Sequence, residues 1–212
     1  YPLRRQRQMC IRDRSKEENM GKIAEEVKEC RRCELWRHRH KPVVGEGSVS
    51  TTIMFVGEAP GYHEDLQGHP FVGSAGELLN ESLSGTGLSR DKVYITNLLK
   101  CRPPNNRDPR PEEVEACGLF LDRQVKIIKP RLIVALGRHS ASYILPKVGR
   151  SFRSMAGVHG KKIYGRLFNR PTTVVPTYHP AAALYNPKYR DFIERDLRVI
   201  GRELKCYRAR IS

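Results

Sequence analysis

Four of the six cysteines have a spacing that could bind a metal. They are Cys30, Cys33, Cys101 and Cys117. A close C-x2-C pair followed by two separated thiolates can hold zinc or a [4Fe–4S] cluster. Zinc ribbons usually repeat the close pair, whereas the second pair here is widely spaced, so the spacing alone does not choose the metal. Cys10 and Cys206 lie near the two ends, and nothing suggests a secreted disulfide framework.

A long glycine-rich loop is the second feature that could do chemistry. Residues 57–76 read GEAPGYHEDLQGHPFVGSAG. Glycines let a backbone approach a ligand closely, but neither G-x-G-x-x-G nor the G-K-[ST] ending of a P-loop is present, which argues against a nucleotide-phosphate cradle. Phe71 in this loop is either a core residue or a ring that stacks on a flat ligand. The alternative for the whole segment is an ordinary strand-to-helix loop.

Two polar residues follow other apolar runs. Asn97 comes directly after KVYIT, and its carboxamide offers one acceptor and two donors, which suits the Watson–Crick edge of a base. A helix N-cap is an equally good interpretation of Asn97. His179 follows TTVVPTY. A lone histidine is more often structural than catalytic, but a position facing the same crevice as Glu58 and Asn97 favours a role in a site.

The elements that must position these residues alternate along the chain. Short apolar runs predict four strands, at residues 52–56, 92–96, 131–136 and 172–175. Helical patterns are expected at residues 17–37, 75–83, 111–128, 139–145 and 187–207. This order predicts an α/β fold with a mostly parallel sheet that is covered on both faces. Ligands of such sheets bind at the carboxyl ends of the strands, where Glu58, Asn97, Gly137 and His179 fall.

The length, hydrophobicity and net charge of the chain limit the kinds of partner that it can bind. The 212 residues suffice for one well-packed domain, and no stretch approaches the ~20 apolar residues of a membrane span. The formal net charge of +16 favours a polyanion such as nucleic acid, because each neutralised phosphate releases counterions. A charged surface without function is the alternative.

Residues 1–19 are expected to be a non-native or disordered leader. Residues 1–15 contribute five Arg and one Asp, about +4, and show no amphipathic period and no long apolar core. We expect the authentic start at Met20 and predict that the leader is dispensable. A basic arm that binds DNA is the alternative.

Taken together, several segments in order resemble the family 4 uracil-DNA glycosylases of thermophilic bacteria and archaea. The matching segments are CRRCELW at 30–36, GEAPGYHEDLQGHPFVGSAG at 57–76, ITNLLKCRPPNNRDP at 95–109, EACGLFL at 115–121 and YHPAAAL at 178–184. The resemblance spans about residue 30 to the C-terminal helix. It implies one domain over residues 20–212, a three-layer α/β/α sandwich with a central, mostly parallel four-stranded sheet.

The resemblance also implies roles for individual residues. Cys30, Cys33, Cys101 and Cys117 are expected to hold a structural [4Fe–4S] cluster. Phe71 is expected to stack on uracil, Asn97 to read its polar edge, and His179 to bond to its ring. Glu58 lines the catalytic side together with backbone groups of Gly57 and Ala59. The wider superfamily has a water-orienting Asp at the position that looks like Ala59, so the water-activating group is open.

The implied activity is the flipping of uracil out of single- or double-stranded DNA and hydrolysis of its N-glycosidic bond. Free uracil and an abasic site result, without a lyase step. Leu184 is expected to wedge the gap in the DNA, or else merely to pack. A cytoplasmic, nucleoid-associated monomer of a prokaryote without membrane contact is expected. The rival functions are a non-catalytic DNA binder and an iron–sulfur redox carrier or sensor.

Overall fold

One mixed sheet organises the protein. The computed structural model describes the backbone of residues 2–209 and the side chains of residues 13–201. In this part of the chain six strands follow the order β1-β3-β2-β4-β6-β5. The central four are parallel: β3 (Tyr94–Asn97), β2 (Ile53–Gly57), β4 (Leu132–Leu136) and β6 (Arg170–Thr177). They are the four strands that the apolar runs predict, so the mostly parallel α/β sheet is confirmed.

The strand count of four is wrong, because two antiparallel strands close the edges. β1 (Glu46–Gly47) pairs with β3, and β5 (Ile163–Leu167) pairs with β6. β1 has only two residues and carries no apolar run. β5 alternates between partly buried and exposed residues within a basic, glycine-containing stretch. Edge strands that are short and half exposed lack the apolar run that reveals a buried strand.

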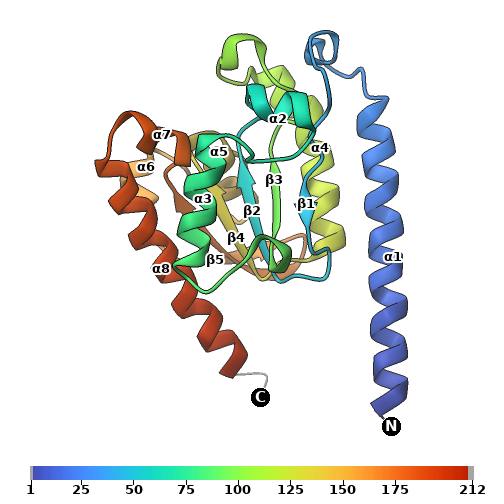
Figure 1. The fold of residues 1–212 in the computed structure, drawn as a ribbon. Coiled ribbons are helices and arrows are strands. Elements are labelled where there is room, and N and C mark those ends of the chain that lie inside the picture. The colour runs from blue at the N-terminus through green and yellow to red at the C-terminus, as the bar shows by residue number, and fades with distance from the viewer. Residues whose placement is uncertain (1, 210–212) are drawn as a thin grey trace.

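Helices cover both faces of the sheet, as a three-layer sandwich requires (Figure 1). α3 (Ser74–Ser84) and α8 (Lys188–Ala209) lie on one face. α1 (Pro2–Lys28), α4 (Pro111–Ile128) and α5 (Arg138–Lys147) lie on the other. The short helices are α2 (Tyr62–Gln67), α6 (Met155–Val158) and α7 (Pro180–Tyr185), with 3-10 turns at Glu34–Arg37, Arg90–Lys92 and Pro104–Asn106. None of the helices in the described residues is long and apolar enough to cross a membrane.

Strand alternation builds two cores from one sheet. In β2, Met54 and Val56 join the core under α4, whereas Ile53 and Phe55 join the core under α3 and α8. All five residues of β2 are buried, and the same holds for β4. Strands that are buried on both faces carry continuous apolar runs rather than alternating ones. This is why these strands could be found in the sequence.

α4 begins where the sequence predicts, and its first turn is held by side chains. Pro111 occupies the first helical position, and the Glu113 carboxylate accepts a hydrogen bond from the Arg110 backbone N–H at 2.9 Å. Arg107 donates a further pair of hydrogen bonds to Glu113. The cap fixes the loop that precedes α4 and thereby the position of Cys117 on this helix.

α1 extends through residues for which no ordered element is expected from the sequence. Its backbone is helical from Pro2 to Lys28 and lies alongside α4 (Figure 1). Met20, Ile23 and Val27 are buried in the core. Lys16 donates to the Val49 carbonyl at 3.3 Å. Helical order in the segment does not settle its origin, so a start at Met20 stays a prediction.

Removal of residues 1–19 should cost little stability, because Met20 is the first buried side chain of α1 in the described range 13–201. We expect the truncated protein to unfold within about 1 kcal/mol of the parent, the value of a partly exposed hydrogen bond. Ile23→Ala, which empties a buried site of the same helix, should cost about 2–5 kcal/mol. Urea unfolding followed by circular dichroism compares the two. A truncation as costly as Ile23→Ala would show that the leader belongs to the fold.

Candidate active site

The carboxyl ends of the parallel strands open into one cavity of about 330 Å³. Five residues predicted from the sequence line it: Glu58, Ala59, Phe71, Asn97 and His179. Gly57 does not line the cavity, but it pairs with Asn97 across β2 and β3. A Cβ on Gly57 would overlap Asn97 Oδ1 and the Phe71 ring. The glycine is therefore required by a close approach of side chains rather than by a ligand touching its own backbone.

Phe71 adopts a backbone conformation that is unusual for a large side chain. Its φ is +54°, in the left-handed region, and the residue is 5% exposed. Its ring lies 5.6 Å from the His179 ring with an interplanar angle of 28°. A Cβ on Gly76 would overlap the Phe71 carbonyl, so this glycine admits the turn. Phe71 thus belongs to the core and also to the cavity wall.

Glu64 holds the glycine-rich loop in place. One carboxylate oxygen accepts from the N–H groups of Val72 and Gly73 at 2.9 and 3.1 Å. The other accepts from the Gly61 N–H at 3.1 Å, at the start of α2. Three backbone donors on one carboxylate fix both limbs of the loop on either side of Phe71. The sequence signal for this role of Glu64 is an acidic residue three positions after the residue that begins a helix, which is typical of a cap.

Asn97 is the last residue of β3 and is 1% exposed. The N-cap interpretation is wrong, because no helix begins at Asn97. Its Oδ1 is buried and has no hydrogen-bond partner among the described residues. Its backbone carbonyl accepts from Lys100 Nζ at 2.7 Å. The backbone of Asn97 is therefore held in place, while its side-chain oxygen still has room for a hydrogen bond from a donor.

His179 precedes α7 and caps it. Its Nδ1 accepts from the Ala181 N–H at 3.2 Å, so the ring proton belongs to Nε2, which is then a donor. Burial lowers the pKa of His179 to about 4, against a smaller opposing effect of the Glu64 carboxylate. The imidazole is therefore neutral at pH 7. Gly137, at the end of β4, allows the close packing, since a Cβ there would lie 3.0 Å from His179 Cβ.

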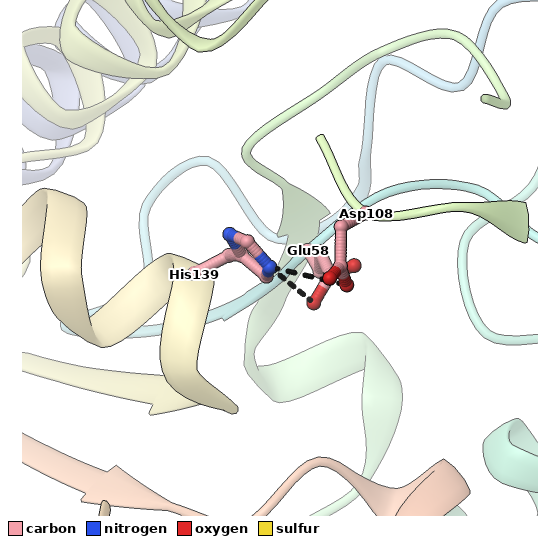
Figure 2. Close-up of side chains that lie close together, drawn as sticks. All are labelled: Glu58, Asp108 and His139. Atoms are coloured by element: carbon pink, nitrogen blue, oxygen red, sulfur yellow. Dashed lines mark hydrogen bonds and ion pairs between the residues drawn. The ribbon is translucent and has the colours of Figure 1, made fainter. Parts of the chain in front are cut away.

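Glu58 lies beside His139 and Asp108, to which no sequence motif points (Figure 2). His139 Nε2, on α5, lies 3.9 Å from Glu58 Oε2 and 3.3 Å from Asp108 Oδ1. Arg138 also pairs with Asp108. Burial raises the pKa of Glu58, and the nearby Asp108 carboxylate adds to this, while His139 and Arg138 oppose it. The available signals were a His three residues after the end of the third predicted strand and the charged NNRDP loop.

The four cysteines predicted as metal ligands line a second pocket under α1 and α4. All four are free thiols. Burial raises the pKa of Cys33 and Cys101, and that of Cys117 to about 12. Arg39 Nη1 donates to Cys101 Sγ and the Lys100 N–H to Cys117 Sγ, both at 3.2 Å. Four thiols in one apolar pocket, with N–H donors to the sulfurs of Cys101 and Cys117, fit a four-thiolate metal centre. The side chains of Cys10 and Cys206 lie outside the described residues.

Leu184 lies on α7, the short helix that His179 begins. It is 53% exposed, which is not what a packed core residue shows, and its neighbour Tyr185 is 90% exposed. No sequence motif points to Tyr185. Two large apolar side chains together on one exposed helix next to a cavity often mark a contact surface.

A cavity at the carboxyl edge of a parallel sheet is where α/β proteins bind small ligands, which places the chain among the α/β proteins with a ligand site at their strand ends. The family model described as the uracil DNA glycosylase superfamily matches residues 44–199. The chain therefore belongs to the uracil-DNA glycosylase superfamily and, by the relatives described next, to its type-4 uracil-DNA glycosylases.

These relatives match most of the chain. The type-4 uracil-DNA glycosylase of Sulfurisphaera tokodaii is 52% identical over 188 residues, which cover 88% of this chain and 85% of that protein. The enzyme of the same name from Saccharolobus solfataricus is 48% identical, with coverages of 88% and 87%. The one from Archaeoglobus fulgidus is also 48% identical, with coverages of 87% and 92%. The resemblance seen in the sequence motifs is confirmed.

Proposed function

We propose that this protein excises uracil from DNA by hydrolysing its N-glycosidic bond, leaving an abasic site. The observation that carries the proposal is the unpartnered Asn97 Oδ1 in the wall of a cavity that Phe71 and His179 also line. The names of the type-4 relatives support the same activity. Since a base inside a duplex is inaccessible, the nucleotide must be flipped out, at a cost of a few kcal/mol.

Recognition follows from complementary hydrogen bonds. Asn97 Oδ1 accepts from the uracil ring N–H, and the carboxamide NH₂ donates to the adjacent carbonyl oxygen. Cytosine would present a donor to the NH₂ and an acceptor to Oδ1, and each mismatched buried group costs about 1–3 kcal/mol. Phe71 stacks on the flat ring and replaces part of the stacking lost from the DNA.

The bond breaks toward an oxocarbenium-like sugar and a uracil anion. His179 Nε2–H donates a hydrogen bond to the negative charge that develops on the base. The ring does so in its neutral form, which is the form present at pH 7. Glu58 orients the attacking water from the wall next to Ala59, the position where the wider superfamily has an Asp. The proposed reaction stops at the abasic site, without a lyase step.

Cys30, Cys33, Cys101 and Cys117 are the residues that would hold a [4Fe–4S] cluster. The cluster would supply structure, since its four ligands lie on the loop after α1, the segment after β3, and α4. The exposed Leu184 is proposed as the wedge that enters the DNA gap. Residues 20–212 would form the functional domain, acting as a monomer on single- or double-stranded DNA in a prokaryotic cytoplasm. The net charge of +16 supports the DNA partner.

Asn97→Asp tests the proposed function most directly. An ionised carboxylate only accepts hydrogen bonds and would face a uracil carbonyl, so uracil release should fall by about 10²-fold or more. The measurement is release of free uracil from an oligonucleotide with one uracil, with the parent and His179→Ala alongside. Metal content and melting temperature should match the parent. Full release by Asn97→Asp would refute the recognition role, and a parent that binds without release would be a non-catalytic binder.

The pH dependence of uracil release should report Glu58. Glu58 acts ionised and its pKa is raised, so the rate should fall as the pH decreases through a value above the usual carboxyl range. His179 adds no step near neutrality, because it stays neutral down to about pH 4. Glu58→Gln should remove the acidic limb and slow release by about 10²-fold. The control is Glu81→Gln, a remote exposed glutamate. An unchanged profile in Glu58→Gln would assign water orientation elsewhere.

The metal centre can be identified by its colour. Purified protein should be yellow-brown with broad absorbance near roughly 400 nm, as a [4Fe–4S] cluster requires. Cys117→Ser should lose iron and destabilise α4 against the sheet. Cys10→Ser and Cys206→Ser should retain the full iron content, which elemental analysis measures. A colourless protein with one zinc per chain would overturn the cluster assignment.

A further inference from the structure

Arg90 uses every donor it has, and two of its acceptors flank Phe71. Its Nε donates to Glu46 Oε1 at 3.0 Å, and its Nη2 donates to Glu46 and to the Pro70 carbonyl, the latter at 2.6 Å. Its Nη1 donates to the Phe71 carbonyl at 3.2 Å and to Asn80 Oδ1 at 3.0 Å. The five N–H groups of a guanidinium are thus all engaged. Arg90 itself does not line the cavity.

The two carbonyls bracket both rotatable backbone bonds of Phe71. The Pro70 carbonyl precedes the bond described by φ, and the Phe71 carbonyl follows the bond described by ψ. Phe71 has a φ of +54°, and a non-glycine residue in this region costs about 1–3 kcal/mol unless its surroundings hold it. A rigid planar fork that binds both oxygens fixes both torsions at once. The direction of the Phe71 ring follows from them.

The guanidinium is itself anchored to the rigid part of the fold. Glu46 lies in β1, which pairs with β3, so one anchor is the edge of the sheet. Asn80 lies in α3, directly after the glycine-rich loop. The Arg90 side chain is only 26% exposed. Arg90 therefore joins the sheet edge, α3 and the loop at Phe71, a residue of the cavity wall with a left-handed backbone conformation.

We propose that Arg90 is the positioning residue for Phe71: it presets the aromatic ring for the base from outside the cavity. The inference rests on the proposed stacking role of Phe71 and names the group on which that role depends. Without the fork, Phe71 can relax toward an ordinary backbone conformation, and uracil binding must then supply the cost of ordering the loop. Lysine cannot replace the fork, because its ammonium is a single point charge with three donors.

A double-mutant cycle with Phe71→Ala tests the inference. Arg90→Lys should slow single-turnover uracil release by about 10-fold in the parent and by less than about 2-fold in the Phe71→Ala background, because residues that act through one another are not additive. Inhibition by free uracil should weaken in the same pattern. Arg123→Lys is the matched control: it changes another arginine paired with a glutamate, Glu26, far from the cavity, and should leave both readouts unchanged.

The outcomes separate this inference from the proposed function. Full uracil release by Phe71→Ala would overturn the stacking role and the inference together. A slow Phe71→Ala with an unaffected Arg90→Lys would overturn the inference alone. An equal loss in both backgrounds would show a general structural role for Arg90 and would also overturn it. If Arg90→Lys fails to fold, Glu46→Gln gives the same cycle, with an expected loss of about 3-fold confined to the Phe71 background.

Discussion

The register between β2 and β3 is the constraint on which the site depends. It sets Gly57 beside Asn97 at the carboxyl edge of the sheet. Because Gly57 has no side chain, Asn97 Oδ1 and the Phe71 ring can both approach that point. A shift by one residue would move every side chain of the strand to the other face. The register of β2 and β3 therefore also determines which polar group faces the cavity.

Hydrogen bonds hold the polar groups around the cavity in place, and Asn97 Oδ1 is the exception. Glu64 satisfies the backbone of the glycine-rich loop, and Lys100 Nζ, fully buried, donates to Thr96, Asn97 and Gln124 at 2.7–2.8 Å. Among the described residues, only Asn97 Oδ1 and Ser82 Oγ are buried side-chain atoms without a partner. Leaving such an atom unpaired costs about 1–3 kcal/mol. Stability alone would not retain it, whereas a ligand that donates to it recovers the cost.

The sequence predicts the framework better than the loops. The four parallel strands and the residues at their ends could be identified because buried runs and strand-end positions follow from local pattern. The sequence does not reveal β1, β5 and α7. β1 has two residues, β5 is a half-exposed edge strand and α7 has six residues, so each shows only weak periodicity. Asp108, His139 and Arg90 act through contacts between segments far apart in the chain. Only the folded loops bring these residues to Glu58 and to Phe71.

The cysteine site and the cavity share one segment of chain. After β3, the N–H groups of Leu98 and Leu99 donate to the carbonyls of Gly57 and Glu58 at 3.0 and 2.9 Å. The next residue, Lys100, donates its backbone N–H to Cys117 Sγ and its ammonium to the Asn97 carbonyl. Cys101 follows at once. Four thiolates bound to one metal centre would thus fix Cys101, at one end of the segment 97–101. The other end of this segment is Asn97, and Leu99 within it donates to the Glu58 carbonyl. Because Asn97 and Cys101 are only four residues apart, a metal centre on these cysteines would help to hold the edge of the sheet that carries Asn97.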